Sequence, residues 1–268
     1  MSAELDIDKA RSIYQATKGL QLDAIPSMDL KDRLSLATVA AGQRPVGVLE
    51  GQGLQLERVR DVLVSHGLQT LITNGVWDKP TVPEQHRYRN HFLTQAKYSQ
   101  QSESRVLWVC GNREQRNQLK ITSRTKGQAG ALLGYPPCCV EDNLRGDAEC
   151  NEAFVKALVD KFGDDEKAIE KAMRDDAGVE ISAPDMSNVP DTEKQFPFVI
   201  HIACRPCLDS NNSPSAILNA QYEKLAQELD VDFHRAILEM ADLFRRDLHG
   251  NELFREMDAI HNRLYVRR

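Results

Sequence analysis

The segment Arg105-Val106-Leu107-Trp108-Val109-Cys110 is the strongest strand signal in the chain, and it ends at Gly111. A short apolar run that is rich in β-branched and aromatic residues and stops at a turn residue is typical of a buried strand. Two segments upstream, 45–49 and 68–73, have a similar character, and the helical pattern of 54–65 separates them. This alternation predicts an α/β fold with a mixed or parallel sheet flanked by helices.

Helical periodicity and helix-end signals predict most of the remaining structure. Ser213 and Pro214 are typical of an N-cap and a first helical turn, and they begin a predicted helical C-terminal region. The segment 196–202 is read as a further strand, whose Pro197 indicates an edge position. The segment 74–104 is read as a long excursion or a linker. The segment 174–194 is read as a loop. The predicted helices are 3–18, 29–41, 54–65, 114–119, 128–133, 138–144, 151–173, one beginning at 214, 232–248 and 251–265.

The predicted domain division places an N-terminal α/β region at 1–104 and a cysteine-containing α/β region with C-terminal helices at 105–268. One continuous domain is the alternative, since 268 residues can form a single large core. The C-terminal amphipathic helices could pack on each other or form a homo-oligomer.

Composition and charge restrict the class of protein. The chain is 41% hydrophobic and 28% charged, which is ordinary for a globular protein, and no apolar run is long enough to span a membrane. Its acidic start lacks the pattern of a signal peptide, which predicts a cytoplasmic protein. A formal net charge of −6 argues against a nucleic-acid partner. A small-molecule substrate is the partner that we expect.

Four of the six cysteines stand in two tight groups far apart in the sequence. Cys138 and Cys139 are adjacent, whereas Cys204 and Cys207 form a Cys-x-x-Cys. Cytoplasmic thiols stay reduced, so paired cysteines favour metal binding or redox chemistry over structural disulfides. These four residues are therefore the candidate ligands of a metal or cluster.

The local sequence predicts where the two pairs lie. The second pair follows the predicted strand 196–202, and the first begins a helix. Gly134 ends the preceding helix, and Pro136 and Pro137 allow a new one to begin, so Cys138 and Cys139 fall in its first turn. Unpaired N–H groups and the helix dipole at that position favour thiolates.

The choice of metal rests on geometry and stays open at this stage. A Cys-x-x-Cys loop can place both sulfurs on one ion, whereas adjacent cysteines are expected to diverge. Two irons of one cluster tolerate such divergence better than one tetrahedral zinc, which favours an iron–sulfur cluster over zinc. A metal-free dithiol is a further alternative, because proline also occurs inside redox Cys-x-x-Cys motifs. In the plainest alternative, the cysteines are ordinary core residues.

Four residues near the cysteines are candidates for supporting roles. His201 precedes Cys204 by three residues and could ligate the metal or move protons, although a buried structural histidine is an equal alternative. Cys110 ends a strand and could approach the site, but core packing is the better expectation. Tyr135 and Glu141 flank the first pair and could support the ligands or act in catalysis, or merely pack and cap.

The stretch 130–141, with Leu133-Gly134-Tyr135-Pro136-Pro137-Cys138-Cys139, resembles the signature of an uncharacterised prokaryotic domain family. That family pairs a Leu-Gly-Tyr-Pro-x-Cys-Cys motif with a downstream motif of two cysteines and a serine. The residues that correspond to the second motif here are His201, Cys204, Cys207 and Ser210. The resemblance implies a shared site but no particular reaction.

Two weaker likenesses concern only the order of the cysteines. The series resembles the cysteine-rich domains of heterodisulfide-reductase type, although Val140 replaces the glycine that follows the doublet there. It is also similar to the cysteine order of the iron–sulfur epoxyqueuosine reductases. Both likenesses imply an iron–sulfur cluster.

These observations lead to three functional hypotheses. The first is a metalloenzyme of small-molecule metabolism with a Cys-ligated centre, an iron–sulfur cluster being favoured, in redox, sulfur-transfer or Lewis-acid chemistry. The second is a non-catalytic binding or scaffold protein with a structural zinc. The third is a metal-free dithiol redox protein. A closed four-cysteine site favours the second, and an open coordination position beside a polar pocket favours the first.

Overall fold

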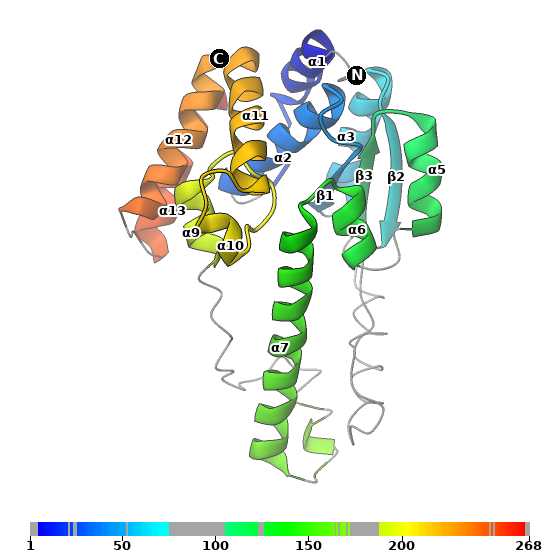
Figure 1. Cartoon of the computed structure of the whole chain (residues 1–268). Helices are drawn as coiled ribbons and strands as arrows, with labels where there is room; N and C mark the ends of the chain where they lie inside the picture. Colours follow the sequence, from blue (N-terminus) through cyan, green and yellow to red (C-terminus); the bar gives the residue numbers. More distant parts are fainter. Residues whose placement is uncertain are drawn as a thin grey trace.

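The structure is a computed structural model, and it describes residues 5–20, 22–23, 26–51, 53–74, 105–122, 126–163, 165, 167–169, 171, 188–246, 248 and 250–265. A small sheet with its helices lies beside a helical body, and one long helix projects away from both (Figure 1). The helices are α1 Ile7–Thr17, α2 Pro26–Ala40, α3 Gly53–Ser65, α5 Arg113–Thr122, α6 Lys126–Leu132, α7 Pro137–Phe162, α9 Asn188–Gln195, α10 Arg205–Leu208, α11 Pro214–Leu229, α12 Val231–Arg245 and α13 Gly250–Tyr265.

The sheet has three strands in the order β1-β3-β2, with β1 at Val46–Gly51, β2 at Gln69–Asn74 and β3 at Arg105–Cys110. Both neighbours pair with β3 antiparallel, and Cys110 aligns with Val46 on one side and with Gln69 on the other. The predicted parallel or mixed sheet is therefore wrong. The strands β1 and β2 do run the same way, as a strand–helix–strand unit requires, but β3 inserts between them in the opposite direction. The sheet thus spans the predicted boundary after residue 104.

The central strand β3 has apolar cores on both of its faces. Leu107 and Val109 face the large core, whereas Val106, Trp108 and Cys110 face a smaller one that includes Leu119, Ala129 and Leu133. Because both faces of β3 are covered, the strand needs no alternation of polar and apolar residues, and its central positions are all apolar.

The helical body confirms the predicted C-terminal helices. Helices α11, α12 and α13 pack in succession, and α1 and α2 join them around a core that contains Tyr14, Leu34 and Phe233. The predicted cap is also present, since the Ser213 side chain accepts a hydrogen bond from the Ala216 N–H at the start of α11.

A buried charged network ties α2 to the C-terminal helix α13. Asp29 is fully buried and accepts hydrogen bonds from Arg33 Nε at 2.7 Å, His261 Nε2 at 3.0 Å and the Leu22 N–H at 2.7 Å. The guanidinium of Arg33 lies over the Tyr265 ring. Burial raises the pKa of Asp29, but the hydrogen bonds from His261 and Arg33 outweigh it and hold this pKa below its ordinary value.

The predicted strand at 196–202 is wrong, because this segment is a turn followed by irregular backbone. The Val199 N–H bonds back to the Phe196 carbonyl at 3.2 Å, which closes the turn. Phe196, Phe198 and Val199 are buried as a strand would bury them. Apolar runs of this length do not distinguish a strand from a buried turn.

Side chains from other elements replace the strand ladder along this segment. Lys31 Nζ donates to the carbonyls of Pro197 at 2.6 Å and Val199 at 2.7 Å, and Asn219 Oδ1 accepts the Phe198 N–H at 2.9 Å. Buried backbone groups must find partners, and here two polar side chains provide them. The segment is thereby fixed against α2 and α11 just before the second cysteine pair.

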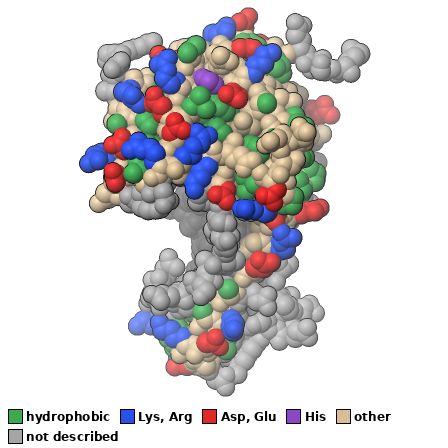
Figure 2. All heavy atoms as spheres, turned by 60° about the vertical axis from the view of Figure 1, so that its left-hand side comes forward, with side chains coloured by type: hydrophobic (Ala, Val, Ile, Leu, Met, Phe, Trp, Pro, Cys, Tyr) green, Lys and Arg blue, Asp and Glu red, His purple; other side chains and the backbone are tan. Residues whose placement is uncertain are grey.

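The segments around the first cysteine pair agree with their predicted helix ends. Gly134 has φ +71°, a conformation that favours glycine, directly after α6. Helix α7 does not stop near Leu144 but continues to Phe162, and much of it extends beyond the body of the molecule (Figures 1 and 2). Figure 2 shows acidic and basic side chains interspersed over the visible face of the body.

Two predicted irregular segments fall partly outside the described residues. The predicted excursion lies almost wholly in 75–104, which the structure does not describe. Within the predicted loop 174–194, the described part is α9 and is helical. In the described part of the chain, no helix combines the length and apolar character needed to cross a membrane.

Candidate metal centre

The four candidate cysteines come together as predicted, although 65 residues separate Cys139 from Cys204. The Sγ atom of Cys139 lies 4.0 Å from that of Cys138, 3.6 Å from that of Cys204 and 3.7 Å from that of Cys207. The Sγ atoms of Cys138 and Cys207 are 3.7 Å apart, and all four lie within 4.8 Å of one another. A group of four convergent thiols can bind a metal.

The first pair lies in the opening turn of α7, as the two prolines indicate. Pro136 is the N-cap, and the Cys139 and Val140 N–H groups both bond to its carbonyl. The expected divergence of the adjacent thiols is not found, because the Cys207 sulfur is 3.7 Å from both of them. Adjacent cysteines at this helix end therefore reach one common point.

The second pair is held by the four-residue helix α10. Cys204 is its N-cap, and the Cys207 N–H bonds to the Cys204 carbonyl at 2.9 Å. This turn brings both sulfurs to the same side. The Cys204 N–H also donates to Cys139 Sγ at 3.4 Å, which stabilises negative charge on that sulfur. Cys138 is exposed, whereas the other three cysteines are buried.

Ser215, in the first turn of α11, is a site residue that the sequence did not reveal. It is fully buried, and its Oγ lies 3.4 Å from Cys139 Sγ and 2.9 Å from His201 Nε2. The sequence gives one indication of this role. Ser215 lies two residues after an N-cap serine, in a helical turn whose backbone N–H groups point out of the end of the helix. The first turns of α7 and α11 thus both face the sulfurs.

The surroundings shift the thiol pKa values in opposite directions. Burial raises the pKa of Cys139 to about 11 and also raises that of Cys204. Burial raises that of Cys207 as well, but hydrogen bonds from the Ser215 hydroxyl and N–H outweigh it, so its pKa is lowered to about 7. The thiols of Cys139 and Cys204 therefore resist losing their protons, and a bound cation would supply the positive charge that their thiolates require.

His201 is buried beside the sulfurs without being one of the four grouped ligands. Burial, followed by the nearby charges of Arg44 and Lys31, lowers its pKa to about 4. The imidazole is therefore neutral at pH 7. Its ring packs against Tyr135 with centroids 5.2 Å apart.

The other predicted supporting residues occupy different positions. The Tyr135 hydroxyl donates to the Ile200 carbonyl at 3.4 Å, so Tyr135 connects the two cysteine-bearing segments. Glu141 is exposed on α7 and forms no hydrogen bond or ion pair with the described residues. Cys110 is buried in the small core behind the sheet, where burial raises its pKa to about 12, and the structure does not bring it to the cysteine group.

The loop that carries Cys204 and Cys207 is also attached to α11 through Ser213. Replacing Ser213 tests that attachment. Ser213 Oγ donates to the Cys207 carbonyl at 2.8 Å and accepts the Ala216 N–H at 3.2 Å. We expect Ser213→Ala to lower the free energy of unfolding by about 1–2 kcal/mol, since it removes an N-cap and this link. Urea unfolding measures the effect. Ser210→Ala, at an exposed position, is the control; equal stabilities of the two variants would contradict the assignment.

A comparison with known protein families, curated proteins and solved structures finds no match to this chain. The resemblance to the Leu-Gly-Tyr-Pro-x-Cys-Cys family stays a prediction.

Proposed function

We propose that the four cysteines hold a single zinc ion and that this ion has a structural role in a binding or scaffold protein. The spacing of the sulfurs carries the proposal. With Zn–S bonds of about 2.3 Å, a regular tetrahedron has S···S edges of about 3.8 Å. Four of the six S···S distances here measure 3.6, 3.7, 3.7 and 4.0 Å, and all six are within 4.8 Å.

The same spacing favours a single ion over the iron–sulfur cluster. In a cluster the four thiolates are divided between two or four irons, and thiolates on different irons stand farther apart than the 4.8 Å within which all four sulfurs lie here. Four cysteines on one ion also close its coordination sphere, which is typical of structural rather than catalytic zinc. A mononuclear iron fits the same sulfurs, and metal analysis separates it from zinc.

The position of the site supports a structural role. The ion would join the start of α7 to the short helix α10, and these segments are far apart in the sequence. Between them lies the irregular segment 196–202, which lacks a strand ladder. A metal bond across such a long loop restricts the unfolded chain and therefore stabilises the native one.

Surrounding groups balance the charge of the proposed centre. Zinc with four thiolates carries a formal charge of −2, which is costly to bury. The Cys204 N–H, the first turn of α11 and the Ser215 hydroxyl all face the sulfurs. The side chains of Arg44 and Lys31 add positive charge near His201.

Metal analysis of protein purified without oxygen tests the proposal. We expect a colourless protein with one zinc per chain, little iron and no acid-labile sulfide. Zinc should dissociate as the pH falls, because protons compete for the thiolates. A brown protein with iron and sulfide would instead support the cluster hypothesis, and a fully folded protein without metal would support the dithiol hypothesis.

A further inference from the structure

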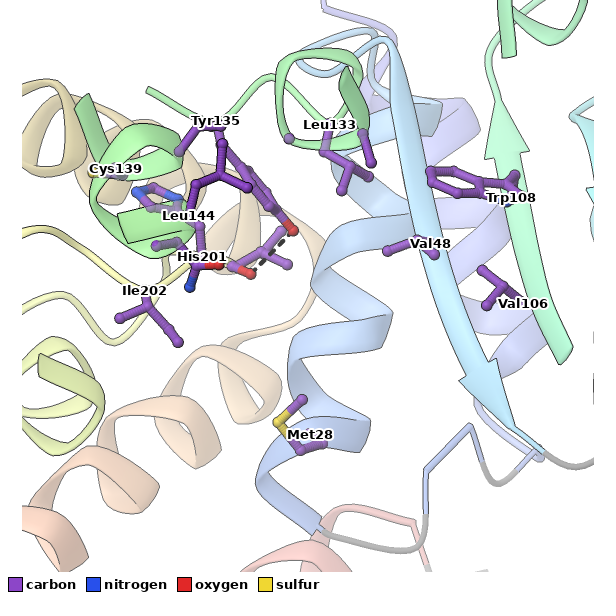
Figure 3. A pocket seen from close by; sticks show the side chains of 15 residues that line it. Met28, Val48, Val106, Trp108, Leu133, Tyr135, Cys139, Leu144, His201 and Ile202 are labelled. Carbon is purple, nitrogen blue, oxygen red and sulfur yellow. Dashed lines mark hydrogen bonds between the residues drawn. The ribbon is translucent and has the colours of Figure 1, made fainter. Parts of the chain in front are cut away.

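A cavity of about 410 Å³ lies directly beside the cysteine group (Figure 3). Strands β1 and β3 form one wall through Val48, Val106 and Trp108, and helix α7 and the segment 200–202 form the opposite one. Cys139 and His201 also line it. The volume falls in the range of small-molecule pockets, about 300–1,000 Å³, and near its lower end.

The described side chains that line this cavity include no acidic or basic residue apart from His201, which is neutral at pH 7. None of its 15 lining residues is Lys, Arg, Asp or Glu, although 28% of the chain is charged. A charged ligand would lose its hydration here without gaining a counter-charge. We propose that the cavity is a binding site for an uncharged, largely apolar molecule of one or two ring systems.

His201 provides the polar contact for such a ligand. Zinc-bound sulfurs are acceptors, so the single proton of the Ser215 hydroxyl is directed to the Cys139 and Cys207 sulfurs, and the hydroxyl oxygen accepts from His201 Nε2–H. Nδ1 of the neutral ring is then an acceptor, and it makes no hydrogen bond within the described residues. The ligand should therefore carry one O–H or N–H donor.

The ligand site and the cysteine group share their supporting segments. Helix α7 begins at Cys138 and Cys139 and supplies Val140, Asn143 and Leu144 to the wall, and the segment 200–202 leads directly to Cys204. The donor preference and this coupling rest on the proposed zinc centre. The absence of Lys, Arg, Asp and Glu from the cavity lining does not depend on it.

A matched pair of fluorescent probes tests the proposal on the purified 268-residue chain with its zinc content measured. N-phenyl-1-naphthylamine is neutral, has two ring systems and carries one N–H donor; 1-anilinonaphthalene-8-sulfonate has the same skeleton with a negative charge. We expect the neutral probe to bind one to one and about tenfold more tightly than the sulfonate. In a Trp77→Phe background, Trp108 is the sole tryptophan and should transfer energy to the bound probe.

Variants locate the binding site. Val48→Phe and Ala129→Leu fill the cavity from two walls, and we expect each to weaken the neutral probe about tenfold. Val64→Phe, on an exposed part of α3, should leave the affinity for the neutral probe unchanged. Asn143→Lys places a cation beside the cavity from an exposed position and should remove the preference against the sulfonate. His201→Phe should weaken the neutral probe about fivefold, the value of one hydrogen bond.

The outcomes of these experiments distinguish the ligand-site proposal from the zinc proposal. Tight neutral binding that both filling variants weaken about tenfold, with their melting curves unchanged, supports the ligand site even in a chain without zinc. Equal affinity for the two probes, or binding that neither filling variant affects, overturns it. No binding by a zinc-loaded chain also overturns it, and leaves the zinc proposal standing.

Discussion

Replacing Cys139 with Ser is expected to abolish stoichiometric zinc binding and to lower the melting temperature by roughly 10 °C. Cys139 is the ligand whose sulfur lies within 4.0 Å of all three others, and it is buried. If free zinc exceeds its dissociation constant about a thousandfold, the bound ion contributes about 4 kcal/mol to native stability. For a chain of this size that corresponds to roughly 10 °C. Metal analysis and calorimetry measure the two effects.

Cys110→Ala is the matched control, because it removes a buried cysteine outside the group. We expect this variant to keep one zinc per chain and to lose only the stability of a small core truncation. Adding a chelator should destabilise the wild type and Cys110→Ala but not Cys139→Ser. Full zinc retention by Cys139→Ser would show that this sulfur is not a ligand.

Replacing Asp29 with Ala is expected to lower the free energy of unfolding by about 3–5 kcal/mol. The side chains of Asp29 and Arg33 are both at most 1% exposed, so the change leaves a buried guanidinium without its carboxylate. The pKa of Asp29 is lowered in the folded chain, so its contribution is complete above the unfolded value of about 4 and is lost as the pH falls through the folded value. The deficit of the variant should therefore shrink in acid.

Urea unfolding at several pH values measures this effect. Asp8→Ala is its control, since Asp8 pairs with Arg11 but is 97% exposed, and a change within about 0.5 kcal/mol is expected. The double variant Asp29→Leu with Arg33→Met should recover part of the loss, because it removes both buried charges. A loss at Asp29 no larger than that at Asp8 would contradict the structural role of the pair.

Much of the fold follows from local sequence. The apolar run of β3, the proline pair before α7, Gly134 and the Ser213 cap each act through backbone conformation or burial within a few residues, so their roles could be predicted. The pairing of β3 between β1 and β2 could not, because periodicity reports burial but not the direction of the neighbouring strand. The turn at 196–199 was misread for a similar reason, since Lys31 and Asn219 satisfy its backbone from distant positions.

Some features of the candidate site could likewise be predicted from the local sequence, and others could not. The grouping of the four cysteines was predicted from their paired spacing and from the reducing cytoplasm in which the chain is predicted to lie. Ser215 was missed because it becomes a site residue only through the approach of α11 to α7. The expected divergence of Cys138 and Cys139 was wrong because the position of Cys207, rather than the local helix geometry, determines whether the two sulfurs can share an ion.

X-ray absorption at the zinc edge of the purified protein tests the central claim most directly, since it reports the atoms bound to the metal. The proposed centre predicts a single shell of four sulfurs at about 2.3 Å. Nitrogen or oxygen in the first shell would contradict the four-cysteine site. Absence of a zinc edge, with an iron-edge spectrum that shows a second iron close by, would replace the single ion with a cluster.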